Sequence, residues 1–139
     1  MKHSDVTVNT NMTLSSLFYA HYSREIPESV HFLQQFREVR FDKFLVNISN
    51  KDNCVKFDGG IVLVRNILKT KSEILVVYQT FCSKKSLFDY PVGSSCFGIH
   101  NVSNLEQTLK SGPITYVQNK FVILPFKSDF VVLPLLHSL

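Results

Sequence analysis

Tryptophan is absent from this sequence, and cysteine is scarce, with three residues among 139. The odd number of cysteines and the lack of a Cys-x-x-Cys pair argue against a disulfide framework and predict reduced thiols in an intracellular protein. The N-terminal residues are polar and lack the apolar core of a secretory signal. No segment approaches the roughly 20 uninterrupted apolar residues that a membrane helix requires. The sequence therefore predicts an intracellular protein with no membrane partner.

Long runs of one charge are also lacking. The chain has 15 Lys and Arg against 11 Asp and Glu, a formal net charge of +4, and its longest basic run is Lys84-Lys85. A nucleic-acid surface gathers positive charge on one face or segment, whereas scattered cations are typical of solubility and of protected strand edges. A nucleic-acid site remains a hypothesis that requires six residues to converge on one surface: Arg37, Arg40, Lys43, Arg65, Lys69 and Lys71.

Apolar residues are plentiful: the sequence is 45% hydrophobic and contains 12 phenylalanines. A chain of this length buries a substantial core, and so many aromatic rings need a packed interior or a partner surface. We expect a single domain over residues 29–139, preceded by a loose or helical segment over residues 1–28.

Three short peripheral helices are predicted. Leu14, Leu17, Phe18 and His21 recur at helical spacing, and Thr13 precedes them as a cap. A second helical stretch is predicted over residues 29–36. Ser103 and Glu106 have the spacing of a capping box, which predicts a third helix over residues 103–110.

Most of the chain has the pattern of β-strands. Asp58-Gly59-Gly60 supplies the residues with positive φ that a tight hairpin requires. Pro125 and Pro134 cannot donate ladder hydrogen bonds, which predicts strand ends or a sheet edge. The sequence therefore predicts a mainly β fold, a compact antiparallel barrel or sandwich, with strands at residues 39–46, 54–57, 61–68, 73–81, 96–102, 117–124 and 130–135.

The stretch from Gly93 to Gly98 places hydroxyls and a thiol among small residues, but it is not the Gly-x-Ser-x-Gly nucleophile elbow. Cys96 and His100 are four residues apart, about 13 Å along a strand, which is too far for proton transfer. We interpret this stretch as a turn with a buried Cys96. An enzyme would require Cys82 or Cys96 beside a histidine in a pocket.

No other catalytic or cofactor pattern is present. The five histidines and three cysteines are spread over the chain, without the close pair that organises a zinc site. No glycine-rich phosphate loop occurs, and no two carboxylates are marked as an acid–base pair. The sequence predicts no catalytic residue, no cofactor and no metal.

A series of features over residues 32–137 resembles a known family. It begins with the strands at 61–68 and 73–81 and continues through Phe88-Asp89-Tyr90-Pro91-Val92-x-Ser94-Ser95-x-x-Gly98-Ile99, residues 102–105, Ile114, Val122-Ile123-Leu124-Pro125 and Leu133-Pro134-Leu135-Leu136-His137. This order resembles the C-terminal β domain of animal transposon-derived proteins. It is more loosely similar to the bromo-adjacent homology (BAH) type of β-barrel, whose strand endings are echoed by Val117-Gln118-Asn119-Lys120-Phe121.

The resemblance implies a β module that docks other macromolecules in a nuclear or chromatin setting. It also implies that this chain lacks the upstream domains of larger members. We therefore expect a non-enzymatic interaction module that binds protein or peptide and presents an exposed apolar patch. The alternative is a nucleic-acid-binding domain that uses dispersed Lys and Arg on one sheet face.

Overall fold

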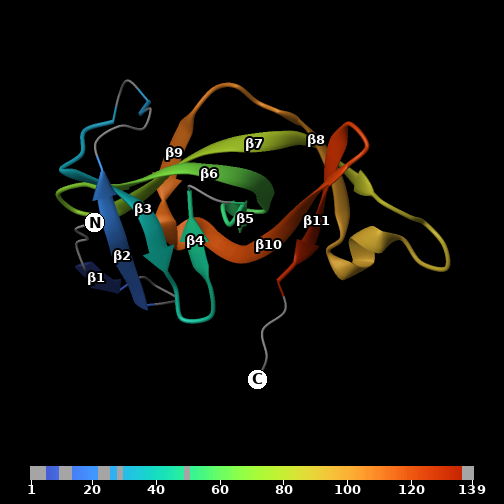
Figure 1. Cartoon of the computed structure of the whole chain (residues 1–139), viewed down its shortest axis with the longest axis horizontal. Helices are drawn as coiled ribbons and strands as arrows, with labels where there is room; N and C mark the ends of the chain where they lie inside the picture. Colours follow the sequence, from blue (N-terminus) through green and yellow to red (C-terminus); the bar gives the residue numbers. More distant parts are fainter. Residues whose placement is uncertain (1–5, 10–13, 22–25, 28–29, 49–50, 136–139) are drawn as a thin grey trace.

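The computed structural model describes residues 6–9, 14–21, 26–27, 30–48 and 51–135 (Figure 1). This part of the chain contains strands, two 3-10 turns and no α-helix. The turns are η1 (Ser94–Phe97) and η2 (Ile114–Tyr116). The strands are β1 (Val6–Asn9), β2 (Leu14–His21), β3 (Gln34–Arg40), β4 (Leu45–Asn47), β5 (Cys54–Phe57), β6 (Gly60–Lys69), β7 (Ile74–Ser86), β8 (His100–Leu105), β9 (Lys110–Pro113), β10 (Val117–Phe126) and β11 (Asp129–Pro134).

All strands join one antiparallel sheet, which confirms the predicted mainly β fold. Six strands curl into a partial ring: β6 pairs with β5, β5 with β10, β10 with β11, β11 with β8, β8 with β7, and β7 returns to β6. The sheet continues from β6 through β3 to β2 and β1, and β4 pairs with β3. In Figure 1, β1–β4 lie at one side of the molecule, and β8 and β11 lie at the other.

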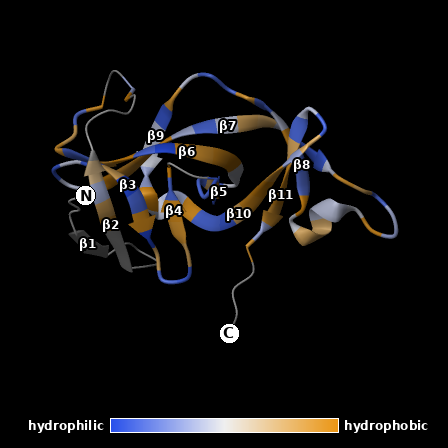
Figure 2. Ribbon diagram, viewed as in Figure 1, coloured by the Kyte–Doolittle hydropathy of each residue, from blue (hydrophilic) through white to orange (hydrophobic). Residues whose placement is uncertain are grey.

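Two long strands close the ring because each one changes partner along its length. β7 pairs with β6 up to Thr80 and with β8 from Phe81 onward. β10 pairs with β5 up to Lys120 and with β11 from Phe121 onward. Figure 2 shows β10 changing from hydrophilic to hydrophobic along the same course. In its hydrophobic half, Phe121 is buried in the ring core, whereas Val122 and Leu124 are exposed.

The hairpin between β5 and β6 is confirmed. Asp58 and Gly59 have φ angles of 47° and 85°, and Phe57 pairs directly with Gly60. Positive φ at both central residues gives a turn whose twist matches that of the flanking strands. Pro125 and Pro134 lie near or at the ends of β10 and β11, also as predicted.

Buried apolar residues form two cores on opposite faces of β5 and β6. Alternate side chains of a strand point to opposite faces, so Val55 and Val62 enter one core while Cys54 and Ile61 enter the other. The large core consists of Leu17, Phe36, Val39, Phe41, Val46, Ile48, Val55, Phe57, Val62, Val64, Ile67, Ile74, Val76, Ile114 and Val117. The ring core consists of Cys54, Ile61, Phe81, Val102, Phe121 and Val132.

The predicted N-terminal helix is wrong, because the segment forms β2. Leu17 lies opposite Val39, and Ala20 lies opposite Phe36, and all four side chains contact the large core. Between them Tyr19 adopts a φ of 60°, which interrupts the alternation of the strand. Core residues therefore recur three apart on a strand, and this spacing imitates a helix.

The second predicted helix, over residues 29–36, is wrong for the residues that the structure describes. Residues 30–33 form no regular element, and β3 begins at Gln34. Thr13 and Ser29, the predicted starts of the first two helices, lie outside the described residues. Because β2 pairs with β3, the sheet crosses the predicted boundary at residue 28.

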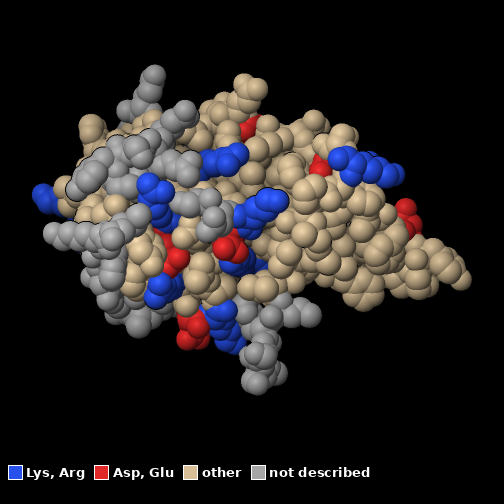
Figure 3. Space-filling model, in the orientation of Figure 1, with Lys and Arg blue, Asp and Glu red and all other residues tan. Residues whose placement is uncertain are grey.

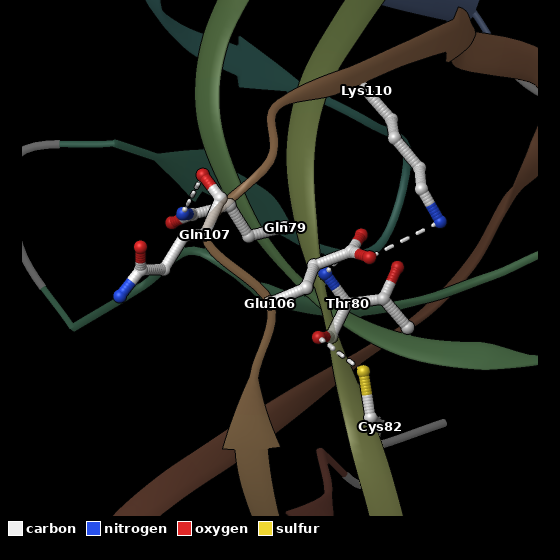
Figure 4. A network of polar contacts seen from close by, with 6 residues as sticks. All are labelled: Gln79, Thr80, Cys82, Glu106, Gln107 and Lys110. Atoms are coloured by element: carbon white, nitrogen blue, oxygen red, sulfur yellow. Dashed lines mark hydrogen bonds and ion pairs between the residues drawn. The ribbon is translucent and has the colours of Figure 1, made fainter.

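The helix predicted around Glu106 is wrong as well, because its carboxylate has a different function. The carboxylate accepts a hydrogen bond from the backbone N–H of Thr80 at 3.1 Å and forms an ion pair with Lys110 at 3.2 Å (Figure 4). The Gln79 side chain meanwhile donates to the Gln107 carbonyl. These contacts hold the connection between β8 and β9 along the edge of β7.

A network of this kind also sets the charge of Glu106. Burial opposes ionisation of the carboxyl, but the hydrogen bonds from Thr80 and the contact with Lys110 outweigh it and lower its pKa.

None of the helices in the described residues is long and apolar enough to cross a membrane.

Candidate functional site

The ring is open at two ends, and the inward side chains of its strands line a cavity at each. Along β10, Phe121 faces one end and Ile123 the other, and along β11, Pro134 and Phe130 divide in the same way. The ring core lies between them. The two ends therefore present successive residues of the same strands, but their chemistry differs.

The first opening, called here the apolar end, has a cavity of about 310 Å³. It is lined by Ile48, Lys51, Asn53, Leu63, Arg65, Ile123, Pro125 and Phe130. Its volume lies at the lower limit of ligand sites in proteins. Apolar side chains form most of the wall, two cations contribute to it, and none of these described lining residues is acidic.

The apolar end is open because β5 is short. β5 has four residues, whereas its neighbours β6 and β10 each have ten. Asn53 extends the line of β5 by one residue: its carbonyl accepts from Val64 N–H at 2.8 Å, and its side-chain amide donates to the Val64 carbonyl at 3.0 Å. On the β5 side, the described strands give β10 no partner beyond Lys120. A seam therefore separates β6 from the second half of β10, and its cavity is also lined by Ile48, Lys51 and Asn53, which precede β5 in the sequence.

Exposed apolar residues border this seam. Val122 and Leu124 lie on the outer face of β10 and are 40% and 50% exposed, and Phe130 at the cavity is 39% exposed. Figure 3 shows the surface around β11 largely free of charged side chains, whereas on the side of β1–β4 Lys and Arg lie among Asp and Glu. The apolar end thus continues into an uncharged surface.

The second opening, called here the basic end, has a smaller cavity of about 100 Å³. It is lined by Lys56, Gly59, Ile61, Lys84, Gly98, His100, Asn119, Phe121 and Pro134. Three of these residues carry or acquire positive charge, and they come from three strands, β5, β7 and β8. None of the described lining residues is acidic.

His100 is the most constrained of these groups. Its Nδ1 atom is buried and has no hydrogen-bond partner among the described residues. Burial, together with repulsion from Lys84 and Lys56, lowers the pKa of its imidazole below the usual value of 6.5. The surroundings of the imidazole therefore favour its neutral form, and a negative charge in the cavity would oppose this shift of its pKa.

The structure disperses the six cations of the nucleic-acid hypothesis. Arg65 lines the apolar end, where its Nε donates to the Gln79 side chain at 2.6 Å. Arg40 forms an ion pair with Glu38 at 2.7 Å and stacks 3.9 Å above the ring of Phe18. These contacts hold the Arg40 side chain against residues of β2 and β3.

The other four candidate cations lie along and beyond β3. Lys69 pairs in register with Gln34 at the start of β3, and Lys71 lies in the turn that follows β6. Arg37 lies within β3, and Lys43 lies in the loop after it. Since β3 has seven residues, the two ends of the set are separated by about 20 Å. The structure therefore does not bring all six residues together.

The interpretation of residues 93–98 is partly wrong. Cys96 lies in η1 rather than in a strand and is exposed. The buried group is Ser94, whose hydroxyl accepts from Leu87 N–H at 2.6 Å and donates to the Ile99 carbonyl at 2.9 Å. The small residues therefore fix a loop.

The cysteines lie apart from the two cavities described here. Cys82 is exposed, and its Sγ lies 3.9 Å from the Thr80 carbonyl. Cys54 is buried in the ring core, and this burial raises its pKa to about 12. Among the described residues, no three His, Cys, Asp or Glu side chains come close enough to hold a metal ion.

Sequence reasoning did not select Lys56, Lys84 or His100 as one site, nor Ile123 and Phe130 as another. The available signal was the alternation of the strands, which places Phe121 and Ile123 on the inner face of β10. Using that signal requires the register of six paired strands, and the single sequence does not give it.

The model of one protein family matches residues 20–135, and its description is Domain of unknown function (DUF8592). The match covers most of the chain but carries no assignment to the BAH type. Neither a curated protein nor a solved structure matches this chain.

Proposed function

The chain belongs to the DUF8592 family, and we propose that it is a non-enzymatic interaction module that docks an extended segment of a protein partner at the apolar end. The observation that carries this proposal is the seam beside the second half of β10. A strand edge next to an apolar cavity is the arrangement used for β-strand addition, in which main-chain hydrogen bonds give affinity and pockets select alternate side chains.

The lining of the cavity indicates the chemistry of the occupant. Leu63, Ile123 and Phe130 form an apolar wall for one large side chain. Lys51, which is exposed, and Arg65 line the same cavity. An acidic residue of the partner, next to its apolar side chain, would therefore complement the positive charge of this cavity. We therefore propose a segment in which apolar and acidic residues alternate.

A protein segment is favoured over a nucleic acid because of how the charges are arranged. Polyanion binding needs several cations on one track, and the six candidate cations are spread from the apolar end to both ends of β3. Val122 and Leu124 instead offer apolar surface beside the seam. A transposon-derived origin, a BAH-like relationship and a nuclear location remain predictions from the resemblance.

A peptide selection tests this function. The full chain is immobilised, random 12-residue peptides are selected from a display library, and the best peptide is titrated by fluorescence anisotropy. Backbone chemical shifts then map the contact. We expect enriched peptides to alternate apolar and acidic residues and to shift the resonances of Leu63, Ile123 and Phe130.

A charge reversal provides the matched control. Lys51→Glu at the cavity should weaken binding of the selected peptide roughly three- to tenfold. Lys71→Glu, which changes another exposed lysine in the β6–β7 turn, should leave the affinity unchanged. If no peptide is enriched, or if shifts map elsewhere, the proposal fails. Binding of random duplex DNA that weakens steeply with salt would support the nucleic-acid alternative instead.

A further inference from the structure

The basic end has features that peptide docking at the apolar end does not use. Lys56 on β5, Lys84 on β7 and His100 on β8 meet around one small cavity. β6, β10 and β11 contribute the neutral residues Ile61, Asn119, Phe121 and Pro134. Positive charges that line one cavity repel one another, and an anion bound between them offsets this repulsion.

We propose that the basic end binds a single tetrahedral oxyanion of the phosphoryl class, held by Lys56, Lys84 and His100. A cavity of about 100 Å³ has room for one phosphate or sulfate ion. The Asn119 side chain adds a neutral amide donor to the same wall.

His100 adds a titratable group to the wall of this cavity. Its Nδ1 atom is itself buried and has no hydrogen-bond partner among the described residues, so the rest of the imidazole faces the cavity. Once protonated, the imidazole carries a positive charge. The negative charge of an oxyanion in the cavity favours this protonated form.

Anion binding at this site is therefore coupled to proton uptake. Among the described residues, the charged groups that act on His100 are Lys84 and Lys56, and the other described residues that line the cavity are uncharged. A bound anion offsets their repulsion and stabilises the imidazolium, so the affinity for an anion of fixed charge rises as the pH falls through the titration of His100.

Sulfate is the first probe, because its charge does not change over this pH range. Sodium sulfate is titrated into the full chain at constant ionic strength in chloride, and binding is followed by backbone and histidine side-chain NMR at pH 7.5 and pH 5.5. We expect saturable shifts around Lys84, Gly98 and His100, at least about threefold tighter binding at the lower pH, and a rise in the pKa of His100.

Two adjacent lysines give a matched pair of variants. Lys84 lines the cavity, whereas Lys85 follows it on β7 and points to the opposite face of the strand. Lys84→Met should weaken sulfate binding about tenfold, which is about 1.4 kcal/mol, and Lys85→Met should weaken it less than about twofold. Equal effects of the two variants, or shifts that do not saturate, overturn the proposal.

Inorganic phosphate and O-phosphoserine distinguish the two sources of the group. Free phosphate binding more tightly than phosphoserine assigns the site to the free ion, and the reverse assigns it to a phosphorylated residue. If neither binds, and sulfate does, the site is not a phosphoryl site. None of these probes is a peptide for the apolar end, so this proposal and the proposed function can fail separately.

Discussion

The large core is enclosed by strands from most of the sheet, whereas the ring core is enclosed by six strands and is bordered by a cavity at each end. The large core contains fully buried side chains such as Leu17, Phe36 and Ile67. In the ring core Phe121 contributes to the wall of the basic end, and the partly buried Ile123 contributes to the wall of the apolar end. Among the described residues, the large core reaches the apolar-end cavity only through Ile48, whereas the ring core borders both cavities.

This difference assigns separate tasks to the two regions. Burial of apolar side chains stabilises a fold roughly in proportion to the area buried. The large core, with fifteen buried residues against six in the ring core, therefore contributes more to holding the sheet in register. The ring core lies between the two cavities, and β5 and β6 form a wall of both cores.

The largest contrast is expected in thiol reactivity. Cys54 lies in the ring core with its pKa raised to about 12, whereas Cys82 and Cys96 are exposed. Reaction requires a thiolate and access. We expect a thiol reagent to label the two exposed cysteines at once and Cys54 at least about a thousandfold more slowly, through unfolding. Mass spectrometry of timed samples measures this, and rapid labelling of Cys54 would show that the ring opens in the native state.

Truncation of one phenylalanine in each core compares their packing directly. Phe36→Ala should lower the free energy of unfolding by about 3–5 kcal/mol, because the side chain is fully buried and leaves a closed cavity. Phe121→Ala should cost less, since its site adjoins the basic-end cavity and water can enter. Urea denaturation of both variants provides the measurement. A larger loss for Phe121→Ala would contradict the division of tasks between the cores.

Two glycines with positive φ test whether the basic end is tightly built. At Gly98 (φ 75°) an added Cβ would lie 2.8 Å from Pro134 Cγ, whereas at Gly59 (φ 85°) it would meet no atom within 4 Å. In both variants alanine must adopt the left-handed backbone conformation that glycine adopts without strain, which costs about 1 kcal/mol. Gly98→Ala should be destabilised by about 1–3 kcal/mol more because of the added contact. Equal melting temperatures for the two variants would contradict this packing.

The two cores also show how much of the fold could be predicted. Alternating residues and the Asp58-Gly59 turn identified the strands around β5 and β6, since these signals are local. The helices failed because Tyr19 with its positive φ gave a strand the spacing of a helix, and because the Glu106 carboxylate binds the backbone of Thr80, far away in sequence. Local spacing does not distinguish these cases.

The sites depend even more on distant pairing. Arg65 was selected from its charge, and the structure places it at the apolar end. Lys56, Lys84 and His100 carry no motif and are up to 44 positions apart in the sequence. They meet because β5, β7 and β8 are brought around the ring by the pairings of β6, β10 and β11. Only the register of the whole ring predicts such a site.

The smallest effect concerns the part of the pH dependence of stability that His100 contributes. The pKa of His100 is lower in the folded chain than in the unfolded chain, so the unfolded state binds the proton first as the pH falls. The contribution of this group to stability is therefore complete above the usual pKa of 6.5 and is lost as the pH falls through the folded pKa. We expect His100→Gln, measured by urea denaturation in chloride alone, to lose less stability between pH 7.5 and 5.5 than the unmodified chain. Sulfate should reduce the loss of stability of the unmodified chain between pH 7.5 and 5.5, because binding of the anion favours the protonated imidazole in the folded state. In His100→Gln the loss of stability over this pH range should be nearly the same with and without sulfate. An identical pH dependence for both chains would show that the basic end does not hold His100 neutral.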